Sequence, residues 1–211
     1  MPLKPSLMGD IQKAFEELWS DLTQLPKEAK GIKLANKLSD AFLDSVTNII
    51  CPLAIVGTLP PSPIPPPYVA MEPAKVTFST PGFPMMSSFS DGWDYKKLAP
   101  ITAKSDAEFF AKGFWSMIAG GIVELKIHSG APALIVPPDT VLSALIMPVF
   151  LSVYTTLGFI GAPKAKSTAL ASGIMPHLIA FILMITVVGP IVKGPPAPLP
   201  IIAGIGTGVL V

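Results

Sequence analysis

Apolar residues in the first fifty positions recur every three or four residues, which is the spacing of an amphipathic helix. In Met1–Asn48 this spacing predicts two helices, and Pro26 is suited to close the first and open the second. The apolar stripes consist of Ile11, Phe15, Leu18, Leu22 and Leu25 in the first helix, and of Ala35, Leu38, Phe42 and Ile49 in the second. Neither helix is long enough to be stable alone in water, so each stripe needs a partner.

A helical hairpin over residues 1–50, or a small bundle shared between subunits, satisfies both stripes. We therefore expect one face of the two helices to form a subunit interface. The residues expected in this interface are Ile11, Phe15, Leu18, Leu22, Leu25, Leu38 and Phe42.

The middle of the chain, residues 51–103, is rich in proline, with eleven prolines in Pro52–Pro100. Because proline lacks an amide hydrogen and has a fixed φ angle, this region is expected to be an extended linker. Its densest part, Pro60–Tyr68, is interpreted as a stiff spacer, and the alternative is a ligand for a proline-recognising domain. Met71–Thr80 alternates weakly, which predicts one strand in this region.

Residues 104–211 are expected to combine helices with short strands. Ser105 and Glu108 have the spacing of a capping box, and Gly120-Gly121 ends the helix that they predict. Ile122–Ile127 then alternates as a strand does. The three regions together predict a mainly α fold with short β segments: an N-terminal helical hairpin or bundle, a proline-rich extended middle and an apolar C-terminal helix-strand region.

Three segments share a local pattern in which an apolar helix is followed by a strand-like stretch that ends near glycine and proline. They run from Leu34 to Gly57, from Phe110 to Gly130 and from Leu170 to Pro190. If these segments are a repeat, it is a helix-then-strand unit used three times.

The opening Met1-Pro2-Leu3-Lys4-Pro5-Ser6-Leu7 precedes an amphipathic helix that contains Phe15. Leu170-Ala171-Ser172-Gly173-Ile174 and Ile185-Thr186-Val187-Val188-Gly189 pair a Leu-Ala helix with a tail of valine, threonine and glycine. In these features the chain resembles small virion proteins of large contractile-tailed bacteriophages. The resemblance implies a non-enzymatic role in the tail or baseplate, with other virion proteins and further copies of the chain as partners.

Composition argues against nucleic-acid binding as the main function. All fifteen basic residues are lysine, and the net charge is only +1. Arginine supplies the bidentate contacts to phosphate and guanine that lysine does not reproduce. A polyanion would therefore meet neither the usual side chains nor a strong positive field.

The titratable residues do not predict a metal or a catalytic site. His128 and His177 lack acidic or cysteine neighbours at ligand spacing. His128 is interpreted as an exposed loop residue, and His177 as a neutral imidazole in a protein core, although in a membrane it would be a functional group. A carboxylate or metal cluster of Glu72, Asp91, Asp94 and Asp106 is the alternative to a simple turn at positions 91–94.

Two further features also have ordinary structural interpretations. Cys51 is the single cysteine and is expected to be a small buried hydrophobe. Gly204–Gly208 resembles a phosphate-binding loop only superficially, and a flexible or closely packed terminal strand is expected instead. We therefore predict no catalytic residues, no metal and no cofactor.

The C-terminal part avoids charge to a degree that needs an explanation. Pro132–Val211 contains four charged residues, Asp139, Lys164, Lys166 and Lys193. That much apolar surface must be covered either by lipid or by other protein.

The membrane hypothesis takes residues 141–162 and 172–192 as two spanning helices, joined by a loop that contains Lys164 and Lys166. The assembly hypothesis buries the same residues between subunits. Frequent prolines, the β-branched runs Leu134–Val136 and Ile185–Val188, and the lack of aromatic residues at the ends of the spans favour assembly. We therefore expect a non-enzymatic structural protein of a phage virion, in the tail or baseplate, with a polytopic membrane protein as the alternative.

Overall fold

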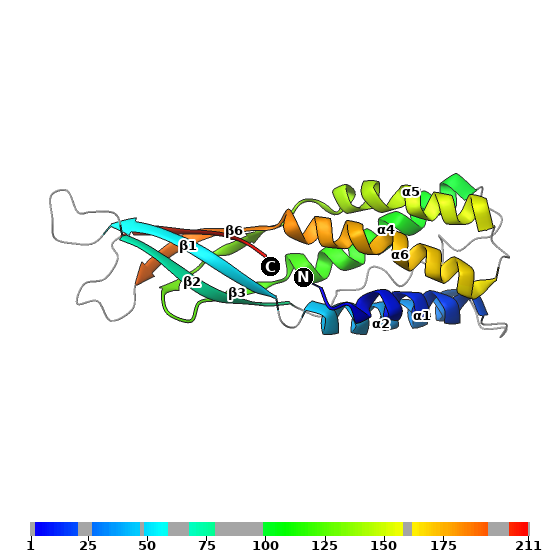
Figure 1. Ribbon diagram of the computed structural model, residues 1–211, viewed down its shortest axis with the longest axis horizontal. Helices are drawn as coiled ribbons and strands as arrows, with labels where there is room; N and C mark the ends of the chain where they lie inside the picture. Colours follow the sequence, from blue (N-terminus) through cyan, green and yellow to red (C-terminus); the bar gives the residue numbers. More distant parts are fainter. Residues whose placement is uncertain are drawn as a thin grey trace.

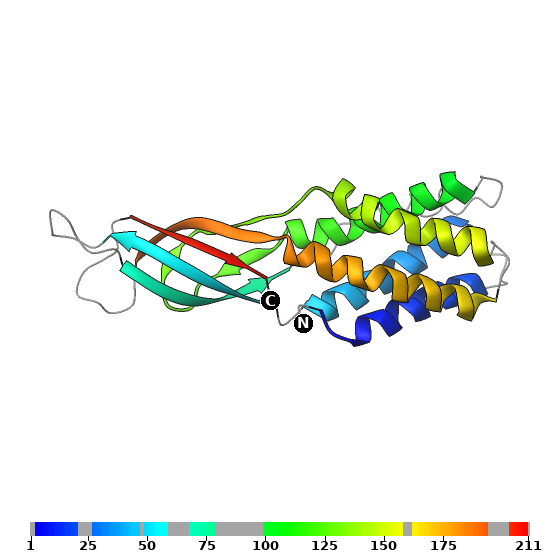
Figure 2. The ribbon, with the colours of Figure 1, turned by 45° about the horizontal axis from the view of Figure 1, so that its top comes forward.

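The structure is a computed structural model, and it describes residues 3–20, 27–46, 49–58, 68–78, 99–157, 162–193 and 203–210. The molecule is elongated, with a mostly helical part at one end of its long axis and a curled antiparallel sheet at the other (Figure 1). Figure 2 shows the same division from another side. Of Pro60–Tyr68, which was interpreted as a spacer, residues 60–67 lie outside the described residues, and Tyr68 is the first residue of a strand.

Among the described residues, five helices form the helical part and lie along the long axis of the molecule (Figure 1). They are α1 (Ser6–Ser20), α2 (Lys27–Val46), α4 (Ala99–Ala119), α5 (Asp139–Leu157) and α6 (Pro163–Leu183). Contacts run from α2 to α1, from α1 to α6, from α6 to α5, from α5 to α4 and from α4 back to α2. The helices therefore close a ring around one shared core.

In the part of the chain that the structure describes, seven strands form the sheet, and every pair in it is antiparallel. They are β1 (Ile50–Thr58), β2 (Tyr68–Thr77), β3 (Ile122–Glu124), β4 (Ser129–Gly130), β5 (Ala133–Ile135), β6 (Thr186–Lys193) and β7 (Ala203–Val209). The spatial order is β3-β2-β1-β7-β6-β4, and β5 also pairs with β6. The sheet thus joins strands from the middle of the sequence to strands from its C-terminal part.

Three helices continue almost directly into strands at the junction of the two parts. Helix α2 is followed by β1, α4 by β3 and α6 by β6, each time after a short connection. This is the helix-then-strand order that the three similar sequence segments predicted. The chain therefore crosses the junction several times, and the two parts are covalently interleaved.

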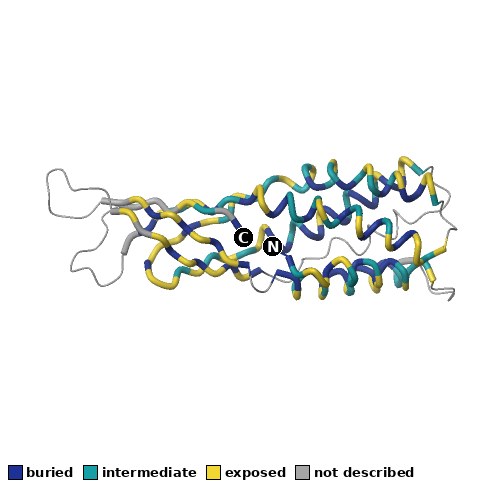
Figure 3. The backbone as a smooth tube through the Cα atoms, viewed as in Figure 1, coloured by how far each residue is buried: buried dark blue, intermediate teal, exposed yellow. Residues whose placement is uncertain are grey.

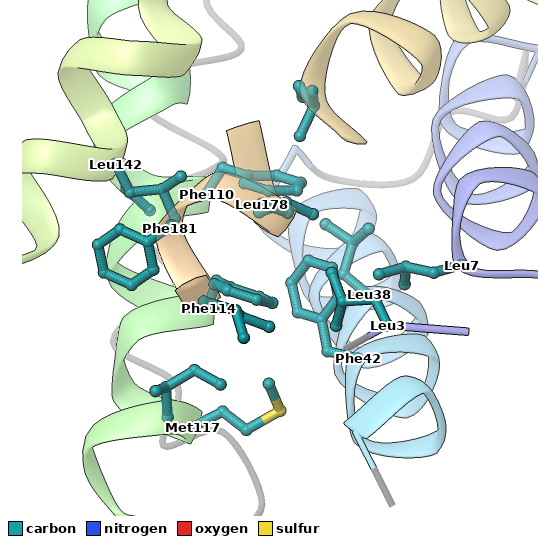
Figure 4. Close-up of a cluster of buried hydrophobic side chains, with 14 of the residues drawn as sticks. Leu3, Leu7, Leu38, Phe42, Phe110, Phe114, Met117, Leu142, Leu178 and Phe181 are labelled. Atoms are coloured by element: carbon teal, nitrogen blue, oxygen red, sulfur yellow. The ribbon is translucent and has the colours of Figure 1, made fainter. Parts of the chain in front are cut away.

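Aromatic side chains from all five helices form the core of the bundle. Phe110 of α4 lies at its centre, with ring centroids 5.4 Å from Phe42, 6.3 Å from Phe150 and 6.5 Å from Phe15. Figure 4 shows how leucines and phenylalanines converge around Phe110 and its neighbour Phe114. Because phenylalanine buries a large apolar area, this cluster contributes strongly to the packing of the bundle.

Strand burial follows the alternation expected for a sheet with one covered face. In β1, Cys51, Leu53 and Ile55 are buried, whereas their neighbours along the strand are exposed. Figure 3 shows this alternation of buried and exposed positions along the sheet. The prediction that Cys51 is a buried hydrophobe is confirmed, and burial raises the pKa of its thiol to about 11.

The glycine-rich run near the C-terminus forms β7, which lies between β1 and β6. A Cβ atom added to Gly208 would lie 2.7 Å from the carbonyl oxygen of Pro52 and 2.9 Å from Sγ of Cys51. A larger residue at this position would collide with β1. The run is therefore a closely packed strand, as one of the two sequence interpretations proposed.

Several predicted boundaries are wrong for reasons of local chemistry. Helix α4 begins at Ala99, so Ser105 lies inside the helix instead of capping it. Pro100 fits the first turn, where the missing amide hydrogen has no helical partner to lose. Similarly, Pro163 begins α6, so the residues predicted as a loop between two spans form a helical turn.

The predicted span 172–192 is also not a single helix. Helix α6 ends at Leu183, and the β-branched residues that follow form β6. The strand expected over Met71–Thr80 is present as β2, from Tyr68 to Thr77. The run Leu134–Val136 likewise contributes to β5.

We predict that Phe110→Ala lowers the free energy of unfolding by about 3–5 kcal/mol, because it leaves a cavity among three other rings. Urea denaturation followed by far-UV circular dichroism measures this loss. Phe109→Ala is the matched control, since Phe109 is the adjacent residue and is only partly buried. Equal losses for the two variants would contradict the central position of Phe110.

Candidate functional site

The outer face of the sheet carries an exposed apolar surface. We call this set of side chains the apolar sheet surface; its members are Ile50, Val56, Val69, Met71, Ile122, Ile135 and Val188. They are between 37% and 70% exposed. Soluble monomers rarely leave so many large apolar side chains on one element in contact with water, so this surface is a candidate for contact with a partner.

The register of β1 and β2 brings part of this surface together. Val56 is opposite Val69, and Met71 is opposite the exposed Ala54. Directly opposed side chains on one face of an antiparallel pair lie about 4.5–5.5 Å apart at Cβ. The two strands thus present a continuous apolar strip, in which Lys75 of β2 is the charged exception.

The outer faces of α5 and α6 differ from the apolar sheet surface. Both helices are long and apolar enough to cross a membrane, and 28% and 50% of their most apolar windows are buried. Yet small, hydroxyl or proline side chains recur every four residues at their exposed positions: Thr140, Ala144, Pro148, Ser152 and Thr156 in α5, and Thr168, Ser172 and Pro176 in α6. In membrane proteins, small residues gather where helices meet, so this pattern fits protein contact better than lipid contact.

A buried carboxylate lies inside the sheet, where the sequence predicted no site. Glu72 of β2 is fully buried, and its carboxylate accepts hydrogen bonds from three successive backbone amides. The amide of Lys126 lies 2.6 Å from Oε1, that of Ile127 lies 3.1 Å from both oxygens, and that of His128 lies 2.9 Å from Oε2. Nδ1 of His128 is 2.6 Å from Oε2 as well.

His128 is therefore not the exposed loop residue that the sequence suggested. It is 5% exposed, and its ring is held against Glu72 inside the sheet. Burial by itself raises the pKa of Glu72, but the hydrogen bonds from His128 and from the amides of residues 126–128 outweigh burial. They hold the pKa of this carboxyl below its ordinary value of 4.5.

The sequence itself carries a signal that Glu72 is buried. In the predicted strand it has the same parity as Ala74 and Val76, so it lies on the inward face with two apolar residues. A buried carboxylate without partners is very costly, which means that such a residue has to be hydrogen-bonded. The identity of the partner, His128, was not accessible because it is 56 positions away.

A second buried polar cluster lies inside the bundle. The hydroxyl of Tyr154 on α5 donates a 2.5 Å hydrogen bond to Oδ2 of Asp106 on α4. Lys166 of α6 is 1% exposed, and its ammonium lies 4.6 Å from the ring centroid of Trp19 on α1. These two contacts involve side chains from four helices, α1, α4, α5 and α6.

The acidic residues considered as a carboxylate or metal cluster do not come together. Glu72 is in the sheet and Asp106 is in the bundle, whereas Asp91 and Asp94 lie outside the described residues. Within the part of the chain that the structure describes, there is no group of three or more His, Cys, Asp or Glu residues that could hold a metal ion. His177 is partly buried on α6.

The residues predicted as a subunit interface contact the same chain instead. Ile11, Phe15, Leu38 and Phe42 are at most 1% exposed, and α4, α5 and α6 cover them. Leu18 is partly buried, while Leu22 and Leu25 lie outside the described residues. A partner therefore cannot reach the four covered side chains in the folded chain.

Comparisons with known proteins give no family for this chain. No protein-family model, no curated protein and no solved structure matches it.

We predict that Lys166 makes stability depend on alkaline pH. Burial lowers the pKa of Lys166 from 10.5 to about 8, so above pH 8 the unfolded chain binds the proton more strongly than the folded chain. Stability therefore rises with pH between about 8 and 10.5. Across this range the free energy of unfolding, measured by thermal unfolding, should rise by up to about 3 kcal/mol more in the unmodified chain than in Lys166→Met.

Lys164→Met is the matched control, because Lys164 is an exposed lysine in the same turn of α6. It should keep the pH dependence of the unmodified chain. If Lys166→Met and the unmodified chain respond to pH in the same way, Lys166 is not held in a desolvated environment.

Proposed function

We propose that this chain is a non-enzymatic structural subunit that assembles through the apolar sheet surface. The observation that most directly supports this proposal is the exposure of seven large apolar side chains on the outer face of the sheet. Because the bundle already has a complete core within one chain, these side chains are not needed for folding. Their exposure is explained if another protein covers them in the assembled state.

The partners in this proposal are further copies of the chain and other structural proteins. An elongated subunit with an apolar sheet at one end and charged helices at the other suits end-on packing into a larger particle (Figure 1). The charged residues on α1 and α2, including the ion pair between Lys37 and Glu17, remain in solvent. Nucleic acid is not a partner in this proposal, because the chain has no arginine and a net charge of +1.

The location that we propose is the virion of a contractile-tailed phage, in the tail or baseplate. This part rests on the resemblance of the opening residues and of the helix-strand segments to small virion proteins. In the same proposal, α1 and α2 form a hairpin within the bundle, and the proline-rich residues act as a bridge. The test is direct: mass spectrometry of purified phage particles should find the chain in the tail fraction.

A polytopic membrane protein is the second candidate, with α5 and α6 as the spanning helices. It is favoured by the length and apolar composition of both helices. In each helix, at least half of the most apolar window is not buried within the chain. Lys166, buried in α6, and the small outward side chains weigh against it. Extraction of expressed chain separates the two: release only by mild detergent supports spanning helices, and release by carbonate supports assembly.

We predict that Val69→Asp combined with Met71→Asp weakens self-association by about tenfold or more, since it places two charges in the apolar strip. Sedimentation velocity of the purified chain over a range of concentrations measures the change. Far-UV circular dichroism should stay the same, because both side chains are exposed.

Lys75→Glu provides the matched control on the same face of β2, where it exchanges one exposed charge for another. It should leave association almost unchanged. Oligomers that are equally stable in the double aspartate variant would show that the chain does not assemble through the apolar sheet surface.

A further inference from the structure

One continuous segment, residues 122–135, connects the two ends of the curled sheet. Its first strand, β3, pairs with β2, and its later strands, β4 and β5, pair with β6. In the strand order, β2 and β6 are each the second strand from an opposite end. The sheet therefore curls until a single stretch of chain reaches both of its margins.

Where the curled sheet closes, β3 and β5 meet without a ladder of hydrogen bonds between them, and we call this contact the seam. Strands β3 and β5 are in contact, but β3 pairs with β2 and β5 pairs with β6 among the described residues. Gly189 of β6 allows the segment to come close, since a Cβ atom there would lie 2.3 Å from Cα of Pro132. Between β3 and β4 the segment is held by the hydrogen bonds to Glu72 and by Leu125, which packs against Ile55 and Ile191.

The reason for these contacts lies in the register of β2. Pro52 and Pro73 are directly opposed on β1 and β2, and two residues without amide hydrogens cannot form a hydrogen-bonded pair. The backbone nitrogen and carbonyl of Pro73 therefore point toward β3. In the ladder between β2 and β3, Lys75 pairs with Glu124, and the same register would pair Pro73 with Lys126. Because Pro73 offers no donor there, the ladder ends, and the amides of residues 126–128 turn to the carboxylate of Glu72.

We propose that Glu72 and His128 form an acid-sensitive latch, and that protonation of Glu72 releases residues 125–128 and opens the seam between β3 and β5 while the helical bundle stays folded. Such a device is independent of the assembly surface on the outer face of the sheet.

The geometry explains why a proton would break the latch. Both carboxylate oxygens already accept hydrogen bonds, Oε1 from two amides and Oε2 from two amides and the ring of His128. A protonated carboxyl turns one of these acceptors into a donor, which then faces donors. The backbone amides can only donate, so at the protonated oxygen they retain at best a weaker, uncharged acceptor, and poorly paired buried donors are costly.

Few other charges can take over the role of Glu72. The nearby charged side chains of β2, of β3 and of the segment after it, Lys75, Glu124 and Lys126, are exposed on the outside of the sheet. On the adjacent β1 the titratable residue is Cys51, and β7 contains none. The hydrogen bonds also hold the pKa of Glu72 below 4.5, so the stability that it supplies is present at neutral pH and is lost as the pH falls below this value.

Cys51 provides a built-in reporter for the opening of the latch. It is the single cysteine, it is fully buried, and it points into the sheet two positions along β1 from Leu53, the residue opposite Glu72. The rate at which a pyridyl disulfide, which reacts with thiols in mild acid, labels Cys51 therefore measures access to the interior. Far-UV circular dichroism, dominated by the five helices, reports in parallel on the bundle.

We expect labelling of Cys51 to accelerate as the pH is lowered through the range below 4.5, while the helical signal is retained. Glu72→Gln should label roughly 10- to 100-fold faster than the unmodified chain at neutral pH, because it loses charge-assisted hydrogen bonds. Its labelling, corrected for the reactivity of a free thiol at each pH, should no longer depend on acid. Glu124→Gln, which removes an exposed carboxylate from β3, is the control and should behave as the unmodified chain does.

His128→Phe keeps a buried ring but removes the donor that lowers the pKa of Glu72, so opening should begin at a higher pH. This variant also keeps the idea testable if Glu72→Gln fails to fold. The latch is refuted if Cys51 stays protected throughout the acid range, if Glu72→Gln is protected as well as the unmodified chain, or if the helical signal disappears together with the protection.

Discussion

A sheet that curls on itself must find partners for the backbone groups along its margins, and this constraint organises the whole β part of the molecule. The outer side of β2 finds partners in β3, and that of β6 finds them in β4 and β5. At Pro73 the ladder to β3 cannot continue, and one buried carboxylate replaces the missing partners. The path of residues 122–135 across the sheet depends on this substitution of a side chain for a strand and on the pairing of β4 and β5 with β6.

The two parts of the molecule bury apolar surface in different ways. In the bundle, phenylalanines from five helices fill a common interior and leave charges on α1 and α2 in solvent. In the sheet, the interior is shallow, and large aliphatic side chains remain on the outside. A fold with a completed core at one end and an uncovered apolar surface at the other separates folding from association. This separation is the physical basis for proposing an assembling subunit.

The local parts of this structure were readable from the sequence, because helical spacing and strand alternation are properties of neighbouring residues. Ile11 and Phe15 marked α1, and the β-branched residues after Leu183 marked β6. Long-range pairing was not readable: Phe110 covers the stripe expected to meet another subunit, and His128 meets Glu72 across 56 positions. Lys166 was misjudged for the same reason, since only the packed bundle places Trp19 against its ammonium.

The continuity of helices and strands at the junction has a mechanical consequence. Because α2, α4 and α6 run on into β1, β3 and β6, a pull along the long axis passes through covalent chain from the bundle into the sheet. Within the sheet the load acts parallel to the strands, so the hydrogen bonds of a ladder must shear together instead of opening one after another. The bundle has no such ladder between its helices and resists only through side-chain packing. Under tension the sheet is thus the stiff element and the bundle the part that yields first.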